Sequence, residues 1–164
     1  MTATATILNV HCVKEASGTD LGSLSPALQE AFNSVLPRVL PAGERPGDVV
    51  ASVVGLISAI DAARSDPDNL YITTNTEGAI ANSIWPGADA TQPLQASQSV
   101  QPHVDVEFVN RVNLSLWDED SAFDSDDLLG SITIEEAERD AGEITRFAFS
   151  PVESSAYYIT YTVT

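Results

Sequence analysis

Hydrophobic and polar residues alternate along several short stretches of the chain, which is the pattern of half-buried β-strands. The alternation is clearest at 112–116 and at 156–163, where every second residue from Tyr157 to Val163 would share one face. Further strands are predicted at 5–13, 70–74, 79–85, 104–108, 131–134 and 144–149. About eight short strands favour an antiparallel Greek-key β-sandwich, so the fold class is mainly β.

Between about 24 and 65 the spacing of apolar residues changes to three and four, which predicts helices. Ser25 is suited to cap the first helix and Asp48 the second, with a Pro/Gly-rich turn between them. We expect this helical hairpin to be an insertion whose apolar faces pack on the sandwich and on each other. The segment 86–102 is predicted to be a loop, and 135–141 to hold one or two helical turns. The whole chain, 1–164, is expected to be a single domain.

Charge changes this picture more than length does. The chain has 24 acidic and 7 basic residues and a net charge of −17, with Lys14 as its only lysine. A basic surface that follows nucleic-acid phosphates is therefore not expected. Cys12 is the single cysteine, which excludes an intramolecular disulfide. We expect neither a signal peptide nor a transmembrane helix, and the compartment stays open.

The acidic residues are densest at 118–127, where six of ten residues are Asp or Glu and none is Lys or Arg. So many like charges raise the energy of a folded loop unless a cation lies between them, and Ca²⁺ takes six to eight oxygen ligands. An EF-hand does not fit, because a loop starting at Asp118 places Phe123 where Gly is required. A loop starting at Asp124 fails as well, because apolar residues fill its fifth and sixth positions. A solvated acidic surface loop remains the alternative to a metal site.

The run Leu116-Trp117-Asp118-Glu119-Asp120, followed after a spacer by Asp126-Asp127-Leu128-Leu129-Gly130, resembles the third calcium-binding loop of C2 domains. The run 104–108 is similar to the strand that precedes it in that family, and 68–72 to the start of the second strand. The resemblance implies a C2-like sandwich with the helical hairpin inserted in its first calcium loop. It also implies Ca²⁺ ligation by a set drawn from Asp20, Asp66, Asp68, Asp118, Asp120, Asp126 and Asp127. The choice between Asp126 and Asp127, and between Asp66 and Asp68, stays open.

The resemblance implies a non-enzymatic calcium-binding module that associates with a phospholipid membrane or a protein partner. One alternative is a calcium-stabilised structural or assembly protein of a larger complex that does not bind lipid. A carboxylate-based hydrolase is a further alternative, since Asp/Glu pairs can act as acid and base. No nucleophile motif or phosphate-binding loop is present in the sequence, so an enzyme is not expected. The oligomeric state stays open.

Overall fold

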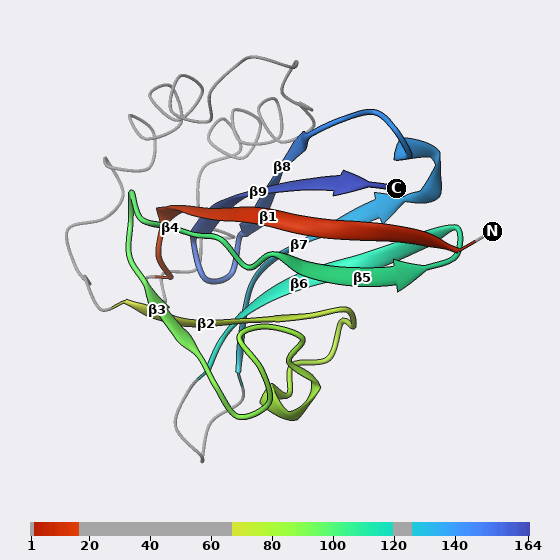
Figure 1. Ribbon diagram of the computed structural model, residues 1–164. Coiled ribbons are helices and arrows are strands. Elements are labelled where there is room, and N and C mark those ends of the chain that lie inside the picture. The colour runs from red at the N-terminus through yellow and green to blue at the C-terminus, as the bar shows by residue number, and fades with distance from the viewer. Residues whose placement is uncertain (1, 17–66, 120–125) are drawn as a thin grey trace.

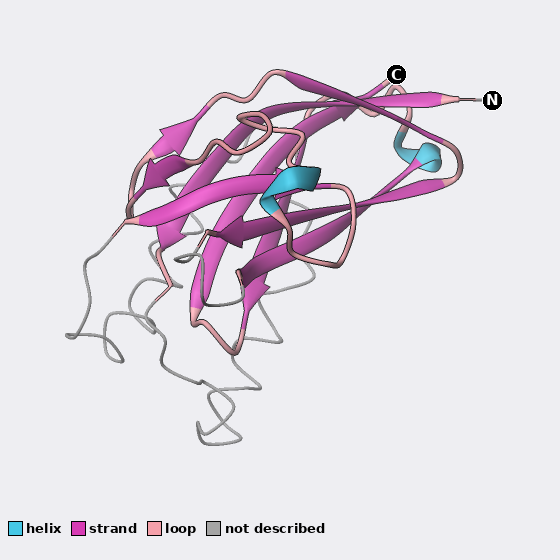
Figure 2. Cartoon of the chain, turned by 90° about the horizontal axis from the view of Figure 1, so that it is seen from below, coloured by secondary structure: helices cyan, strands magenta, loops and turns pink. Residues whose placement is uncertain are grey.

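Two antiparallel β-sheets form the part of the chain that the computed structural model describes, residues 2–16, 67–119 and 126–164 (Figure 1). The first sheet contains β1 (Ala3–Lys14), β4 (Ser99–Val100), β5 (Val104–Phe108), β8 (Ile144–Ser150) and β9 (Ser155–Val163). The second sheet contains β2 (Asp68–Thr73), β3 (Gln92–Leu94), β6 (Arg111–Asp118) and β7 (Asp127–Glu135). Two short 3₁₀ turns, η2 (Ile80–Asn82) and η3 (Glu136–Glu138), complete the described elements, as Figure 2 shows.

The long strand β1 organises the first sheet, whose order is β4-β1-β9-β8. One edge of β1 pairs with β9, and the other edge is shared by β5, opposite residues 3–7, and β4, opposite residues 10–11. The second sheet has the order β3-β2-β6-β7. The predicted mainly-β antiparallel sandwich is therefore confirmed, with nine strands in the described residues where eight were expected. The Greek-key connectivity stays a prediction, and the helical hairpin predicted at 24–65 falls outside the described residues.

The core lies between the two sheets and follows the predicted alternation. Tyr157, Ile159 and Tyr161 on β9 are fully buried, and every second residue of this strand faces the core. Leucine and isoleucine side chains from β2 and β6 meet them from the second sheet: Leu70, Ile72, Leu114 and Leu116. Removing this apolar surface from water is the main stabilising term of the fold.

Two predictions of local structure are wrong, because hydrogen bonding between strands determines these segments more than their own residue pattern does. The segment 79–85, predicted as a strand, contains η2 and only a single bridge, in which Ile72 N–H donates to the Trp85 carbonyl at 2.9 Å. The segment 86–102, predicted as a loop, supplies β3 and β4 to sheet edges. The helical turn predicted within 135–141 is present as η3. Edge strands this short depend on their neighbours for hydrogen bonds and carry little pattern of their own.

The strands β7 and β8 close one side of the sandwich by direct contact between the sheets. Gly130 has φ +143°, and a Cβ at this position would lie 2.6 Å from the Phe149 backbone nitrogen. The Ser155 hydroxyl donates to the Leu129 carbonyl across the same junction, at 2.8 Å. Only glycine allows the two backbones to approach this closely in that conformation.

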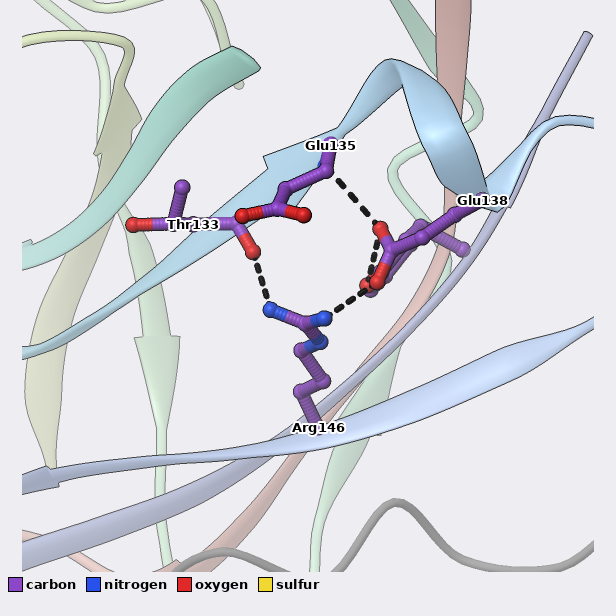
Figure 3. A network of polar contacts seen from close by, with 5 residues as sticks. Thr133, Glu135, Glu138 and Arg146 are labelled. Carbon is purple, nitrogen blue, oxygen red and sulfur yellow. Dashed lines mark hydrogen bonds and ion pairs between the residues drawn. The ribbon is translucent and has the colours of Figure 1, made fainter.

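A polar network joins β7, η3, β8 and β9 near the chain termini (Figure 3). The Glu138 carboxylate accepts the Glu135 backbone N–H at 3.0 Å and the Tyr161 hydroxyl at 3.0 Å. The Arg146 guanidinium pairs with Glu138 and also donates to the Thr133 carbonyl. The Thr133 carbonyl lies on β7, so this arginine also covers a backbone acceptor of an edge strand.

Candidate functional site

The candidate residues of the described part gather at the end of the sandwich away from the N- and C-termini (Figure 1). Here β6 ends while β2 and β7 begin, which follows from the antiparallel pairing of β2 with β6 and of β6 with β7. The end of β1 lies here as well, because Ala16 donates to Asp68. Asp68 opens β2, Asp118 closes β6, and Asp126 and Asp127 stand at the start of β7. The strand order brings these four positions to one end of the sandwich, and their role in binding a metal stays a prediction.

Asp118 and Asp127 lie directly opposite each other on β6 and β7. A register shift between Leu116 and Trp117 creates this pairing, because an unbroken register would place Leu128 opposite Asp118. Both aspartates are half-buried, and Asp118 also accepts the Asn69 backbone N–H at 2.6 Å. Like charges at directly opposed positions destabilise a sheet, so this pair raises the energy of the strand ends in the absence of a cation.

Asp68 is held from inside the protein. Its side chain accepts the Ala16 backbone N–H at 2.9 and 3.1 Å, one distance to each oxygen, and also the Tyr157 hydroxyl. The residue is 2% exposed. Burial raises the pKa of Asp68 to about 7, and the charges of Asp118 and Glu15 add to this, while the hydrogen bonds from Tyr157 and Ala16 act in the opposite direction.

Asp126 is held by a second tyrosine. The Tyr71 hydroxyl donates to Asp126 at 2.5 Å, and burial together with this bond raises the pKa of Tyr71. Gly78 lies close to the neighbouring Trp117 ring, so that a Cβ at this position would come within 2.8 Å of it. The Trp117 indole N–H in turn donates to the Thr73 hydroxyl at 3.0 Å. The connection after β2 therefore packs on Trp117, while Tyr71 on β2 holds Asp126 next to the start of β7.

A buried cation also belongs to this end of the molecule. Lys14 is 7% exposed, and its ammonium group donates to the Ser154 carbonyl at 3.0 Å and to the Glu15 carbonyl at 3.3 Å. Sequence reasoning did not find the roles of Lys14, Tyr71 and Tyr157. Each of these residues lies in a strand pattern that indicates only burial. The hydrogen-bond partners are remote in sequence: Asp126 for Tyr71, Asp68 for Tyr157 and Ser154 for Lys14.

The described residues do not form a complete cation site by themselves. Within 2–16, 67–119 and 126–164, no group of three or more His, Cys, Asp and Glu residues is arranged to hold a metal ion. Asp20, Asp66 and Asp120, which complete the predicted ligand set, fall outside the described residues. Among the described residues, no helix is long and apolar enough to cross a membrane.

Comparison with known proteins gives likenesses only at the level of structure. No protein-family model and no curated protein matches the chain. A solved C2 domain is similar at 14% identity and a TM-score of 0.41, with 100% of this chain and 98% of that chain covered. The chain resembles a C2 domain.

A second similar structure is a much longer enzyme. Human GIVD cytosolic phospholipase A2, solved with methyl γ-linolenyl fluorophosphonate and terbium chloride, matches at 15% identity and a TM-score of 0.37. The match covers 99% of this chain and only 17% of the phospholipase chain.

Proposed function

We propose that this protein is a non-enzymatic Ca²⁺-binding module whose cation lies where β6 ends and β7 begins. The observation that supports this most directly is the opposed pair Asp118 and Asp127, which the register shift brings together at the entrance to the acidic segment. A hard divalent cation would offset the repulsion between two carboxylates, and oxygen is its preferred ligand.

Asp118 and Asp127 are the proposed ligands from the described residues, and Asp120 is proposed beside them. Asp66 and Asp20 are the proposed contributors from the segment between β1 and β2. Asp126 is half-buried, with one oxygen accepting the Tyr71 hydroxyl and the other as its proposed contribution to cation binding. The bound cation would supply positive charge that holds the acidic strand ends together and attracts an anionic group of a partner.

The proposed role of the bound cation is association with a phospholipid membrane. With a net charge of −17, the protein repels anionic surfaces until cations reverse the local field. Two exposed apolar side chains lie at the same end of the sandwich: Leu128, which is 38% exposed and follows Asp127, and Val152, which is 60% exposed in the turn next to Ser154. Such residues beside a cation site suit an interface with lipid or with a protein. Assembly with a protein partner is the second candidate.

Calcium titration by calorimetry, with thermal melts run with and without chelator, tests the proposal. The wild type is expected to bind Ca²⁺ saturably and to melt at a higher temperature when loaded, because a ligand that binds only the folded state stabilises it. Asp118→Asn and Asp127→Asn are each expected to weaken binding by at least about tenfold, since each removes a charged ligand.

Asp140→Asn is the matched control for this titration. The residue is exposed near the chain termini, and its φ of 61° is a conformation that asparagine adopts readily. This variant should bind Ca²⁺ as the wild type does. If the wild type binds no Ca²⁺ at millimolar concentration, the proposal is wrong and the acidic segment is a solvated surface.

A further inference from the structure

Asp68 differs from the other described carboxylates in what surrounds it. It is the first residue of β2 in the second sheet, whereas its donor Tyr157 lies on β9 in the first sheet. Its other donor, the Ala16 backbone N–H, belongs to the residues that follow β1. A single carboxylate therefore connects both sheets and the segment leaving β1.

The hydrogen bonds of Asp68 leave little of it for a cation. The Ala16 N–H lies within 2.9 Å of one oxygen and 3.1 Å of the other, and Tyr157 donates to the second oxygen as well. With 2% of the residue exposed, the carboxylate faces protein donors rather than the open end of the sandwich. A calcium ligand must instead present an oxygen to the ion alongside five to seven others.

We propose that Asp68 is a positioning residue, which clamps the start of β2 to β9 and to the end of β1 beneath the candidate cation site and does not itself bind the cation. The clamp stands on the contacts of Asp68, Ala16 and Tyr157, whereas the statement about the cation rests on the proposed function. The C2 resemblance implies the opposite role for Asp68, that of a ligand, so the two assignments make different predictions.

The clamp predicts a specific pattern of stability, because a buried acceptor that loses its donor is penalised for desolvation. Asp68→Ala removes the acceptor for both donors, and Tyr157→Phe removes one donor. Asp68→Asn keeps an oxygen that can accept from Tyr157 or Ala16, so it should rescue most of the loss. The two residues share one interaction, and their effects should therefore not multiply.

Urea unfolding in the presence of chelator measures this pattern without any cation. Asp68→Ala and Tyr157→Phe should each raise the unfolding equilibrium constant by about tenfold or more. In the double variant, the increase in this constant should be well below the product of the two single increases. Tyr161→Phe is the matched control: it is also buried on the same face of β9, but its hydroxyl donates to Glu138 at 3.0 Å. The effects of Tyr161→Phe and Asp68→Ala should multiply.

A second arm separates positioning from ligation by calcium calorimetry. Asp68→Asn should keep its Ca²⁺ dissociation constant within about threefold of the wild type, while Asp118→Asn weakens it by at least about tenfold. Equal losses in the two variants would overturn the positioning role. If Asp68→Ala does not fold, Tyr157→Phe alone decides the clamp in urea unfolding, where a Tyr157→Phe variant as stable as the wild type would overturn it. A wild type that binds no Ca²⁺ would defeat the proposed function, while the chelator arm would still decide the clamp.

Discussion

Tyrosine hydroxyls control two of the acidic side chains at the end of the sandwich. Tyr157 donates to Asp68 and Tyr71 donates to Asp126, and both rings are fully buried. A buried tyrosine contributes apolar area with its ring and one hydrogen bond with its hydroxyl. These two residues therefore belong at once to the packing of the sheets and to the orientation of the carboxylates, whereas Asp118 and Asp127 face each other across a strand pair.

The raised pKa of Asp68 predicts an unusual dependence of stability on pH. Burial lifts this pKa from 3.8 to about 7, so between those values the folded state holds a proton that the unfolded state has lost. The resulting stabilisation is fully present below about pH 4 and is lost as the pH rises through about 7. Between about pH 5 and about pH 8, the chelator-treated wild type should lose at least about 1.4 kcal/mol more stability than Asp68→Asn.

Urea unfolding of both proteins across this pH range measures the difference. The carboxylates whose charges act on Asp68, Asp118 and Glu15, are present in both proteins, so the comparison isolates the Asp68 carboxyl. Parallel pH profiles for the wild type and Asp68→Asn would show that the Asp68 carboxyl has an ordinary pKa in the folded protein.

At the scale of elements, the sandwich is closed differently on its two sides. On one side β7 and β8 meet through Gly130, and side chains of the first sheet cover carbonyls of β7. On the other side β3 in one sheet and β4 with β5 in the other are edge strands. Asp105 and Glu107 on β5 are exposed, and charged residues at a sheet edge oppose pairing with another chain.

Gly130→Ala tests how much the close approach of β7 and β8 contributes. The added methyl group would lie 2.6 Å from the Phe149 nitrogen and 2.8 Å from the Ala148 carbonyl carbon, so the strands would have to separate. Gly87→Ala is the control, because Gly87 has the same φ of +143° but no atom within 4 Å of an added Cβ. Gly130→Ala should cost about 1–3 kcal/mol more than Gly87→Ala in urea unfolding. Equal losses of stability in Gly130→Ala and Gly87→Ala would mean that backbone strain at positive φ, and not the contact between β7 and β8, accounts for the effect.

At the scale of the whole molecule, the surface combines a strong negative charge with exposed apolar side chains at both ends. The net charge is −17, and the large exposed hydrophobics among the described residues are Val109, Leu128 and Val152. Leu128 and Val152 lie at the acidic end, while Val109 lies in the turn from β5 to β6 near the termini. Membrane association through the acidic end should therefore depend on two of these residues and not on the third.

Co-sedimentation with phosphatidylcholine/phosphatidylserine vesicles measures this dependence. The wild type should pellet with Ca²⁺ and remain in the supernatant with chelator, because the cation is needed to overcome charge repulsion. Leu128→Ser combined with Val152→Ser should reduce the bound fraction severalfold, since about 25 cal/mol is lost for each Å² of apolar surface that no longer reaches lipid. Val109→Ser should leave it unchanged. Saturable Ca²⁺ binding without pelleting would instead favour the assembly role.

The local pattern of the sequence determined the class of the fold and where its acidic groups would stand. Alternation along β9 and β6 identifies buried faces, because side chains of a strand point to opposite sides in turn. The positions of Asp68 and Asp118 next to strand ends also follow from that pattern, and antiparallel pairing brings such ends together. In contrast, β7 begins at Asp127, before the strand predicted at 131–134. The segment 79–85 shows the limit of this reasoning, since it forms a 3₁₀ turn and a single backbone bridge to Ile72 instead of a strand.

Only the tertiary structure decided how the acidic groups are held. Asp127 lies opposite Asp118 because β7 has one extra residue, a bulge, between the pairs Leu116–Gly130 and Trp117–Leu128. The position of this bulge depends on packing across the sheets. Asp68 became an interior residue because Tyr157, 89 positions away, donates to it from the other sheet. A period-two pattern indicates which side of a strand is buried, but it does not indicate which residue, distant in sequence, will form a hydrogen bond there.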